Sequence, residues 1–421
     1  MHDRDDRGRV GAAGIQAPTG CTGLSNPPFC FEKLFFSPGR RLTWGTALGN
    51  DTISAVDFAA TMARASDALK SREATLAELA KARNVLVYSF GACGKNLARQ
   101  LRHAGINCVI FDNAKTAVAE AAAEGFETTA TLDLDIPWLV AAGQNQLAIL
   151  PTLPRPAYNL VEGLYAFDLV SSYGNARTFA HFLAERIDEL YALYHGTEAS
   201  CQNELLALLQ FRASLDVRYL AARRTPVAQM WVPPEAVGGI ESFCDVGAYD
   251  GDTLIQMKAA FPDLRSSFAV EPNADMVAKI EAVAARLGLD NRIFVGLAWN
   301  HATKLDVRTL PSGMMAVTES DTGAILADTL DHVTAPDSYE YVKFDVEGAE
   351  QAALQGGRNL LRNARCIAVA CYHFSGDIID IPQQLESVLG ESSNAAWRRG
   401  FHHYSECFED SIFYYYRSCG D

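Results

Sequence analysis

The stretch that decides the fold is ESFCDVGAYDGDT, residues 241–253. A short apolar run from Phe243 to Val246 is typical of a buried strand, and Asp245 lies near its end. Gly247 and Gly251 follow in a loop, and a helical pattern begins after them. A glycine loop between a strand and a helix lets a ligand approach the backbone. The stretch therefore predicts a ligand site at the carboxyl end of a strand.

The acidic residues of this loop restrict the ligand. A pyrophosphate at the following helix N-terminus would be repelled by Asp245, Asp250 and Asp252. S-adenosylmethionine (SAM) has no phosphate, and the same carboxylates would attract its sulfonium and ammonium groups. Glu271 ends the next strand, in AVEPN, near the distance at which an acid binds a ribose. The loop therefore favours a cationic nucleoside cofactor, although Asp250 or Asp252 could serve only the turn, and Asp252 or Thr253 the helix cap.

Strands and helices alternate from about residue 240 to the end of the sequence. Strands are expected at SFCDVG, SSFAVEP, RIFVGLA, YVKFDVEG and CIAVACYH, with patterned helices between several of them. The last segment, GFHHYSECFEDSIFYYYRS, predicts two strands joined by a short turn. This order indicates a mostly parallel, doubly wound α/β sheet that ends in an antiparallel hairpin.

Together these segments resemble the FkbM family of SAM-dependent methyltransferases. The resemblance rests on DVGAYDGDT (245–253), VEPN (270–273), TLDHV (329–333), YVKFDVEGAEQAALQGG (341–357), CYH (371–373), HHYSE (402–406) and SIFYYY (411–416). It covers about residues 232–418 and implies a class I methyltransferase fold. It also implies O-methylation of a hydroxyl on a small molecule or glycan, with a sugar-like acceptor favoured. One departure is Cys371, where some members of the family carry an acid.

The resemblance also implies which residues bind the cofactor. Asp245, Gly247 and Gly251 would line the methionine part of SAM, and Glu271 would hold both ribose hydroxyls. Pro272, Asn273 and Ala298 would lie near the adenosine. The remaining loop residues of this expected cofactor site are Ala248, Tyr249, Asp252 and Thr253.

Candidate catalytic residues follow the next two strands. An alcohol is a weak nucleophile, so a base must remove its proton during attack. Asp345 and Glu347 end one strand and His373 ends the next, and we expect His373 or Asp345 as the base, with Glu347 orienting the acceptor. Lys343, two residues before Asp345, could pair with it, which would hold Asp345 ionised. Glu347 could instead cap a helix and His373 could be a satisfied strand-end residue. A divalent metal on Asp345 and Glu347 ranks below a metal-free site.

A separate α/β unit precedes this region. NVLVYSF (84–90) and INCVIFD (106–112) are expected strands around a helix at 91–105, and AIL (148–150) is expected to end another strand. The turn SFGACG (89–94) matches G-x-G-x-x-G except that Ser89 replaces the first glycine, and Asp112 ends the following strand. Such a turn can hold a dinucleotide, but we favour a tight packing turn in a Rossmann-like domain.

The expected organisation has four parts. A disordered tail covers residues 1–50, a helix plus the Rossmann-like α/β domain covers 51–155, a helical connector covers 156–235 and the methyltransferase domain covers 236–421. Two other functions remain open. One is a nicotinamide-dependent enzyme that uses the first α/β unit, and the other is a non-catalytic SAM-binding scaffold.

Composition and charge indicate which binding partners and which cellular compartment to expect. The 421 residues carry a formal net charge of -15 without a basic patch, which disfavours nucleic acid and anionic membranes. The ten cysteines include no CxxC pair, so we expect no zinc site and a reducing compartment. The beginning, MHDRDDRGRV, lacks the apolar region of a signal peptide, which favours a cytoplasmic protein. A small-molecule or glycan acceptor is the expected partner, and a homo-oligomer is possible.

Overall fold

The computed structural model describes residues 53–171, 174–221, 225, 227–234, 237–309, 315–390 and 397–417. The expected disordered tail, residues 1–50, lies outside this described part. All described residues belong to one compact unit, Gly45–Asp421. The domain boundaries placed at residues 155 and 235 therefore stay predictions.

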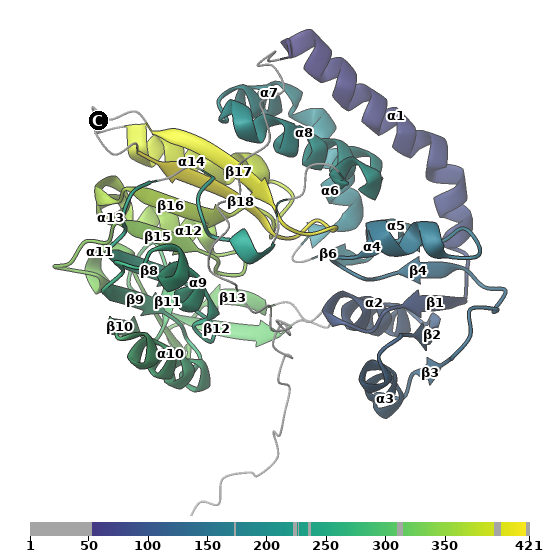
Figure 1. Cartoon of the computed structure of the whole chain (residues 1–421), viewed down its shortest axis with the longest axis horizontal. Helices are drawn as coiled ribbons and strands as arrows, with labels where there is room; N and C mark the ends of the chain where they lie inside the picture. The colour runs from purple at the N-terminus through teal and green to yellow at the C-terminus, as the bar shows by residue number, and fades with distance from the viewer. Residues whose placement is uncertain are drawn as a thin grey trace, which may run out of the picture. The chain divides into compact units, whose positions relative to one another are not determined.

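The first α/β unit is a five-stranded parallel sheet in the order β3-β2-β1-β4-β5. Its strands are β1 (Asn84–Tyr88), β2 (Asn107–Phe111), β3 (Glu127–Thr128), β4 (Trp138–Val140) and β5 (Tyr158–Asn159). Its helices are α2 (Ala92–His103), α3 (Lys115–Ala123), α4 (Gln146–Ile149) and α5 (Leu160–Ala166). The two strands and the helix expected around the first glycine turn are all present, as Figure 1 shows at its lower right.

The strand expected to end at residues 148–150 is wrong. Those residues lie in α4 and in a short 3-10 turn, Leu150–Thr152, where Pro151 fits the first turn. The strand beside β1 is β4, whose three residues are all buried and pair with Leu86–Tyr88. A run of three residues is too short for an apolar pattern to distinguish a strand from a loop.

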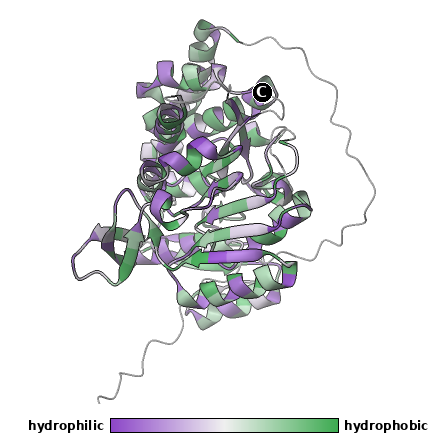
Figure 2. Ribbon diagram, turned by 90° about the vertical axis from the view of Figure 1, so that its left-hand side faces the viewer, coloured by the Kyte–Doolittle hydropathy of each residue, from purple (hydrophilic) through white to green (hydrophobic). Residues whose placement is uncertain are grey.

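Helices α1 (Ala55–Leu79), α6 (Ala176–Glu185), α7 (Ile187–His195) and α8 (Ala199–Ser214) pack together, with α1 also against α5 and α8 also against β17 (Arg398–His403) (Figure 1). In α1, Ser54 accepts the Asp57 N–H as the N-cap, and every third or fourth residue from Phe58 to Leu79 is buried along most of the helix. Figure 2 shows green and purple residues alternating along the helices, as amphipathic helices require. None of the helices in the described ranges has the length and apolar character to cross a membrane.

The second sheet has seven strands in the order β10-β9-β8-β15-β16-β18-β17. The strands are β8 (Ser242–Val246), β9 (Ser266–Val270), β10 (Asp290–Phe294), β15 (Tyr341–Phe344), β16 (Cys366–Ala370), β17 (Arg398–His403) and β18 (Ser411–Tyr416). Its helices are α9 (Asp252–Ala260), α10 (Ala274–Leu287), α11 (Leu330–Val333), α12 (Glu350–Gly356), α13 (Arg358–Asn363) and α14 (Asp377–Gly390). All pairs are parallel except those of β18, which confirms the expected doubly wound sheet with its closing hairpin.

A small sheet is inserted after β10. It consists of β11 (Leu297–Ala298), β12 (Thr303–Thr309), β13 (Met315–Glu319) and β14 (Ile325–Asp328), in the order β11-β14-β12-β13. The expected strand RIFVGLA is divided between β10 and the first strand of this sheet, and the other three strands were not predicted. In the part that the structure describes, these strands are largely half-buried or exposed, so they lack the apolar run that marks the strands of the main sheet.

Residues of the helical connector cover the outer edge of the second sheet, where β17 is the last strand. The Glu198 N–H donates to the Arg399 carbonyl at 2.8 Å, and the Thr225 N–H donates to the His403 carbonyl at 3.2 Å. The His403 N–H in turn donates to Glu204 Oε1 at 2.7 Å. The connector therefore satisfies backbone groups of an edge that would otherwise face solvent.

Candidate active site

The second glycine loop is built by close backbone approach. Gly247 has φ of +87°, and a Cβ there would lie 1.8 Å from the Asp345 carbonyl oxygen, so only glycine fits between β8 and β15. Gly251, with φ of +83°, is the N-cap of α9. The expected cap at Asp252 or Thr253 is wrong. Asp252 is the first residue of the helix, and its Oδ1 accepts the Thr253 N–H at 2.8 Å.

A buried ion pair joins the two central strands of this sheet. Asp245 and Lys343 are register partners on β8 and β15, and Lys343 Nζ donates to Asp245 Oδ1 at 2.8 Å. The expected pairing of Lys343 with Asp345 is therefore wrong, because the neighbouring strand offers a carboxylate directly opposite the lysine. Lys343 Nζ also donates to the Gly247 carbonyl at 2.8 Å. Burial raises the pKa of Asp245, and the Lys343 ammonium opposes that shift.

Asp245 keeps one carboxylate oxygen for a further donor. Its Oδ2 is buried and has no hydrogen-bond partner among the described residues. An orphaned acceptor on a buried carboxylate is costly, and it is relieved when a ligand donates to it. The residue thus fits a ligand cation at the carboxyl end of β8, where the sequence predicted the methionine part of SAM.

Glu271 lies at the end of β9 and is held by two backbone amides. Its Oε2 accepts the Tyr249 N–H at 3.0 Å and its Oε1 accepts the Asn273 N–H at 2.8 Å. Burial raises its pKa, while the two amides oppose that change. The carboxylate is therefore fixed beside the glycine loop, with lone pairs left to accept the hydroxyls of a ribose.

The remaining expected cofactor residues surround this carboxylate. Ala248 is buried, and its N–H donates to the Val270 carbonyl, directly before Glu271. Pro272 follows Glu271, and Asn273 caps α10 by accepting the Asp275 N–H. Ala298 is buried at the end of β11 in the small sheet. The structure thus brings Tyr249, Glu271 and Asn273 into contact, whereas Ala298 belongs to the small sheet.

His373 is buried among three carboxylates. Its Nδ1 is 3.1 Å from Glu350 Oε1, and its Nε2 is 3.7 Å from both Asp345 Oδ1 and Glu347 Oε2. Burial alone would lower the pKa of the imidazole, but Glu350, Asp345 and Glu347 outweigh burial and raise the pKa to about 10. The three carboxylates therefore favour the imidazolium form of His373. This charge state disfavours the expected role of His373 as the base.

Glu350 is the site residue that the sequence reasoning missed. It is buried, its Oε1 accepts the Val346 N–H at 2.8 Å and its Oε2 accepts the Gly348 N–H at 3.1 Å. These bonds hold a loop in which Glu347 and Gly348 both have positive φ. Glu350 belongs to the quoted KFDVEGAE segment, but nothing in that pattern distinguishes a buried carboxylate from an exposed helix-start acid.

Asp345 receives a hydrogen bond from a second missed residue. The Tyr372 hydroxyl donates to Asp345 Oδ1 at 3.1 Å, and the Tyr372 ring lies 4.3 Å from the His373 ring, between centroids. Asp410, at the start of β18, is a third missed residue. Burial raises its pKa to about 8, with Glu409 and Asp345 adding to the shift and His373 opposing it. Asp410 thus adds an acid to this end of the sheet, near Cys371.

Asp345, Glu350 and His373 also offer three ligand atoms within 4.8 Å of one another. A divalent cation there would need a neutral His373 and a free Glu350 carboxylate. Both Glu350 oxygens already accept backbone N–H groups, and the imidazolium already balances the acids. The ion-pair network therefore satisfies this cluster without a metal.

The first glycine turn has different surroundings. Asp112 accepts the Phe90 N–H at 2.7 Å and the Ala114 N–H at 2.8 Å. The loop between β17 and β18, residues 404–410, packs against the unit that carries this turn, and the Glu406 N–H donates to the Gly143 carbonyl at 2.8 Å. The Cys407 thiol of the same loop contacts Cys93 in the first turn of α2. This contact supports the packing interpretation of the turn.

Comparison with known proteins identifies the second α/β unit. Residues 245–401 match the model of the methyltransferase FkbM domain. The crystal structure of the methyltransferase FkbM from Methylobacillus flagellatus KT superposes with a TM-score of 0.63 at 17% identity, covering 86% of this chain and 100% of that chain. At that identity the likeness concerns the fold, and it extends over both α/β units.

Two further solved methyltransferases match less of the chain. The rRNA methylase from Streptococcus thermophilus has a TM-score of 0.28 at 9% identity and covers 44% of this chain and 91% of its own. The O-methyltransferase TomG from Streptomyces achromogenes, in complex with SAM, has a TM-score of 0.27 at 10% identity. The match covers 43% of this chain and 74% of that chain. No curated protein matches the sequence. The seven-stranded sheet and its acidic glycine loop thus lie in the part of the chain, residues 245–401, that is similar to the methyltransferase FkbM domain.

Proposed function

We propose that the protein is a SAM-dependent O-methyltransferase that acts on a hydroxyl of a small molecule or glycan, with a sugar-like acceptor. The observation that carries the proposal is the unpaired, buried Oδ2 of Asp245 beside Gly247. A buried carboxylate with one oxygen open suits a cationic ligand group and opposes a phosphate. SAM, when bound, supplies a methyl group already activated on a sulfonium.

The chain's own residues divide into a cofactor part and an acceptor part. Asp245 would receive the ammonium of SAM, and Glu271 would accept its ribose hydroxyls. Both carboxylates are fixed before any ligand arrives, Asp245 by Lys343 and Glu271 by two backbone amides. Such preorganisation reduces the entropy that binding must overcome.

Asp345 is the better base of the two expected candidates. His373 is already an imidazolium, so it has no lone pair to accept the acceptor's proton. On Asp345, Oδ1 accepts the Tyr372 hydroxyl, which leaves Oδ2 to take that proton. Glu347, whose side chain is 57% exposed, can turn toward the acceptor and orient it. His373 then acts by holding Asp345 and Glu347 in place through its positive charge.

The charge of this end of the sheet restricts the acceptor class. Asp345 Oδ1 and Glu347 Oε2 both lie 3.7 Å from His373 Nε2, so two carboxylates share one ring, whereas the raised pKa of Asp410 favours its neutral form. A phosphorylated or carboxylated acceptor would be repelled there, whereas hydroxyl groups can donate to the carboxylates. A neutral or cationic polyhydroxyl molecule therefore fits better than an anionic one.

The two competing functions have weaker support. A nicotinamide enzyme would need the first glycine turn open to a pyrophosphate, but Cys407 contacts Cys93 beside it and Glu406 adds a carboxylate that accepts the Leu147 N–H. A non-catalytic scaffold would not need the buried His373–Glu350 pair next to Asp345. Binding of SAM or of NAD distinguishes the methyltransferase from a nicotinamide-dependent enzyme. Turnover of SAM with an acceptor distinguishes the methyltransferase from a non-catalytic scaffold.

Calorimetric titration of the full chain with SAM, and separately with NAD, tests the proposal. We expect SAM to bind, and Asp245→Asn and Glu271→Ala to weaken it by at least ~10-fold, the loss of one charge-assisted hydrogen bond. Asp112→Ala is the matched control, because Asp112 occupies the position of Glu271 in the first unit. Binding of NAD without SAM, or equal loss of SAM binding in the control, would overturn the assignment.

A further inference from the structure

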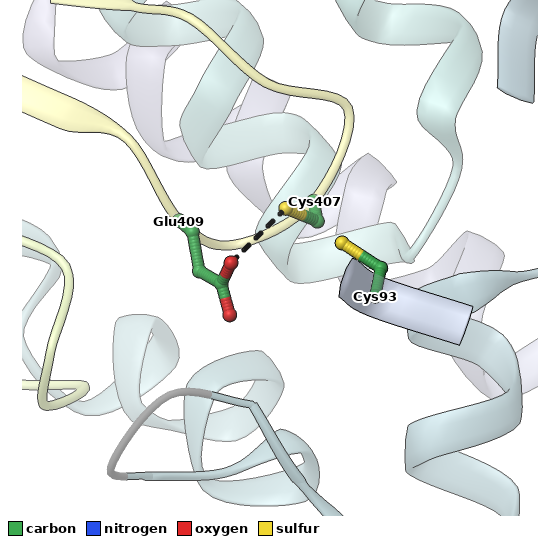
Figure 3. A group of neighbouring side chains, drawn as sticks. All are labelled: Cys93, Cys407 and Glu409. Atoms are coloured by element: carbon green, nitrogen blue, oxygen red, sulfur yellow. Dashed lines mark hydrogen bonds between the residues drawn. The ribbon is translucent and has the colours of Figure 1, made fainter. Parts of the chain in front are cut away.

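Two cysteines and a glutamate meet where the first α/β unit contacts the methyltransferase sheet. Cys93 is the second residue of α2, and Cys407 and Glu409 lie in the loop between β17 and β18. Figure 3 shows the Cys407 sulfur pointing toward the Glu409 carboxylate, with the Cys93 sulfur close to Cys407. Cys407 Sγ donates to Glu409 Oε2 at 3.9 Å, and the three possible ligand atoms all lie within 4.8 Å of one another.

The surroundings keep these side chains in place and accessible. A Cβ at residue 143 would lie 2.7 Å from Cys93 Sγ, so Gly143 makes the space that this sulfur occupies. The Cys407 thiol also donates to Ser405 Oγ at 3.2 Å, and Ser405 Oγ donates to the Glu409 carbonyl at 2.7 Å. Cys407 is buried, whereas Cys93 and Glu409 are half-buried and can be reached from solvent.

We propose that Cys93, Cys407 and Glu409 form a binding site for a thiophilic divalent cation, of which zinc is the type, and that the ion joins the first α/β unit to the hairpin loop. Thiolate and carboxylate ligands bind zinc at about 2.3 and 2.0–2.2 Å, which places two ligands of one tetrahedral ion about 3.7 Å apart. Separations of up to 4.8 Å therefore need only small side-chain movements to close on an ion. Water would complete a fourth position.

Binding would exchange protons for the ion. The thiols of Cys93 and Cys407 each lose a proton, the Glu409 carboxylate joins them, and one zinc ion binds, so that two protons leave for each ion bound. The end of α2 beside Cys93 carries partial positive charge that suits a thiolate. No oxidant or reductant takes part.

A carboxylate beside two sulfur atoms favours a bound cation over a disulfide. Glu409 takes no part in a disulfide, whereas its Oε2, 3.9 Å from Cys407 Sγ, can serve a cation as a third ligand.

Cation binding at this site would affect the candidate active site through one residue, Asp410. Asp410 follows Glu409, and its carboxyl interacts electrostatically with Asp345, Glu347 and His373. An ion that fixes Glu409 also fixes the backbone that positions Asp410. The cation would thus hold the acceptor end of the sheet in place and take no part in methyl transfer.

The test measures zinc binding by competition with a chromophoric chelator, and cobalt(II) binding by its thiolate charge-transfer absorption. All measurements use the full chain with Cys21, Cys30 and Cys419 changed to serine, because these cysteines lie outside the described residues. We expect one zinc per chain and a cobalt–thiolate band. Cys93→Ser and Cys407→Ser should each lower the zinc affinity at least ~100-fold, and Glu409→Gln at least ~10-fold.

Cys108→Ala is the matched control, since Cys108 is buried in β2 within the same first unit and away from the cluster. It should bind zinc like the parent. The cobalt spectrum of the parent does not depend on whether any variant folds. Absence of the band, or zinc bound only at the level of Cys93→Ser, would overturn the proposal. So would a mass loss of two hydrogens on exposure to hydrogen peroxide that zinc does not prevent, because that outcome assigns a redox pair instead.

Discussion

The two glycine turns of this chain share a backbone design and differ in what surrounds it. Each follows a central parallel strand, and in each a glycine Cβ would collide with a carbonyl oxygen, at 2.0 Å for Gly94 and 1.8 Å for Gly247. In each, an acid at the end of the next strand, Asp112 or Glu271, accepts two backbone N–H groups. A glycine pattern therefore reports a tight turn and not the ligand.

What separates the turns is buried charge and access. The second turn has Asp245 and Lys343 in the sheet beneath it, with one carboxylate oxygen left unpaired among the described residues. The first turn is contacted by Cys407 of the hairpin loop, and the Glu406 N–H of the same loop donates to the Gly143 carbonyl in the same unit. The comparison teaches that the same turn can serve cofactor binding or packing, and that the neighbouring strands decide which. Four changes can break or sharpen this distinction.

The largest effect is expected from Asp245→Asn. The variant leaves the Lys343 ammonium buried without its carboxylate, which costs ~3–5 kcal/mol of unfolding free energy. Asp112→Asn should cost only about 1 kcal/mol, because its amide oxygen still accepts one of the two N–H groups. Urea unfolding of both variants measures the difference. Equal losses would show that buried charge does not distinguish the two turns.

Gly247→Ala and Gly94→Ala test the shared backbone design. Both place a methyl group against a carbonyl oxygen, so both should lower the free energy of unfolding by ~1–3 kcal/mol. Gly247 also has positive φ, which should place its loss at the upper end of that range. In calorimetry only Gly247→Ala should lose SAM binding. Loss of SAM binding in both variants would indicate that the first turn supports the cofactor site.

Asp410→Asn tests how the acidic end of the seven-stranded sheet makes the free energy of unfolding depend on pH. Burial raises the pKa of Asp410 to about 8, from an ordinary 3.8, so the folded chain holds this proton more tightly than the unfolded chain. The resulting stabilisation is complete below pH 4 and is lost as the pH rises through 8. Asparagine stays neutral, so the variant should match the parent near pH 4 and exceed it by ~1–3 kcal/mol near pH 9. A pH-independent difference in urea unfolding would contradict this.

The smallest effect is expected from Ser89→Gly, which restores the complete G-x-G-x-x-G pattern in the first turn. Ser89 has φ of +81°, and relief of its strain should stabilise the chain by about 0.5–1 kcal/mol. We expect no NAD binding by calorimetry, because the hairpin loop still lies against the turn. Binding of NAD to Ser89→Gly would mean that one missing glycine, and not the loop, decides the function of the first turn.

The sequence predicted the backbone of the site better than its side-chain partners. Asp245, Gly247 and Glu271 follow the strands where local pattern placed them, because a strand, a glycine loop and a helix are neighbours along the chain. Lys343 was paired with Asp345 on its own strand, whereas its partner comes from the adjacent strand. Pairing across a sheet depends on register, which local pattern does not contain.

The same limit explains the residues that were missed. Glu350 and Asp410 become important only because the fold buries them near His373, and their sequence neighbours resemble ordinary helix-start and turn acids. Cys93 and Cys407 come from opposite ends of the described chain, so a search for closely spaced cysteines could not join them. Short strands such as Trp138–Val140 were missed for a different reason. Three residues are too few to show an apolar pattern typical of a strand.

The covered edge of β17 has a consequence for how the chain can be divided. A fragment that began at the predicted boundary, residue 236, would lack Glu198, Glu204 and Thr225, which bond to Arg399 and His403. Its last strand would then present bare N–H and C=O groups in line, the arrangement through which sheets of different molecules join and aggregate. Solubility of a fragment that holds only the second α/β unit thus depends on residues that belong to neither of the two α/β units.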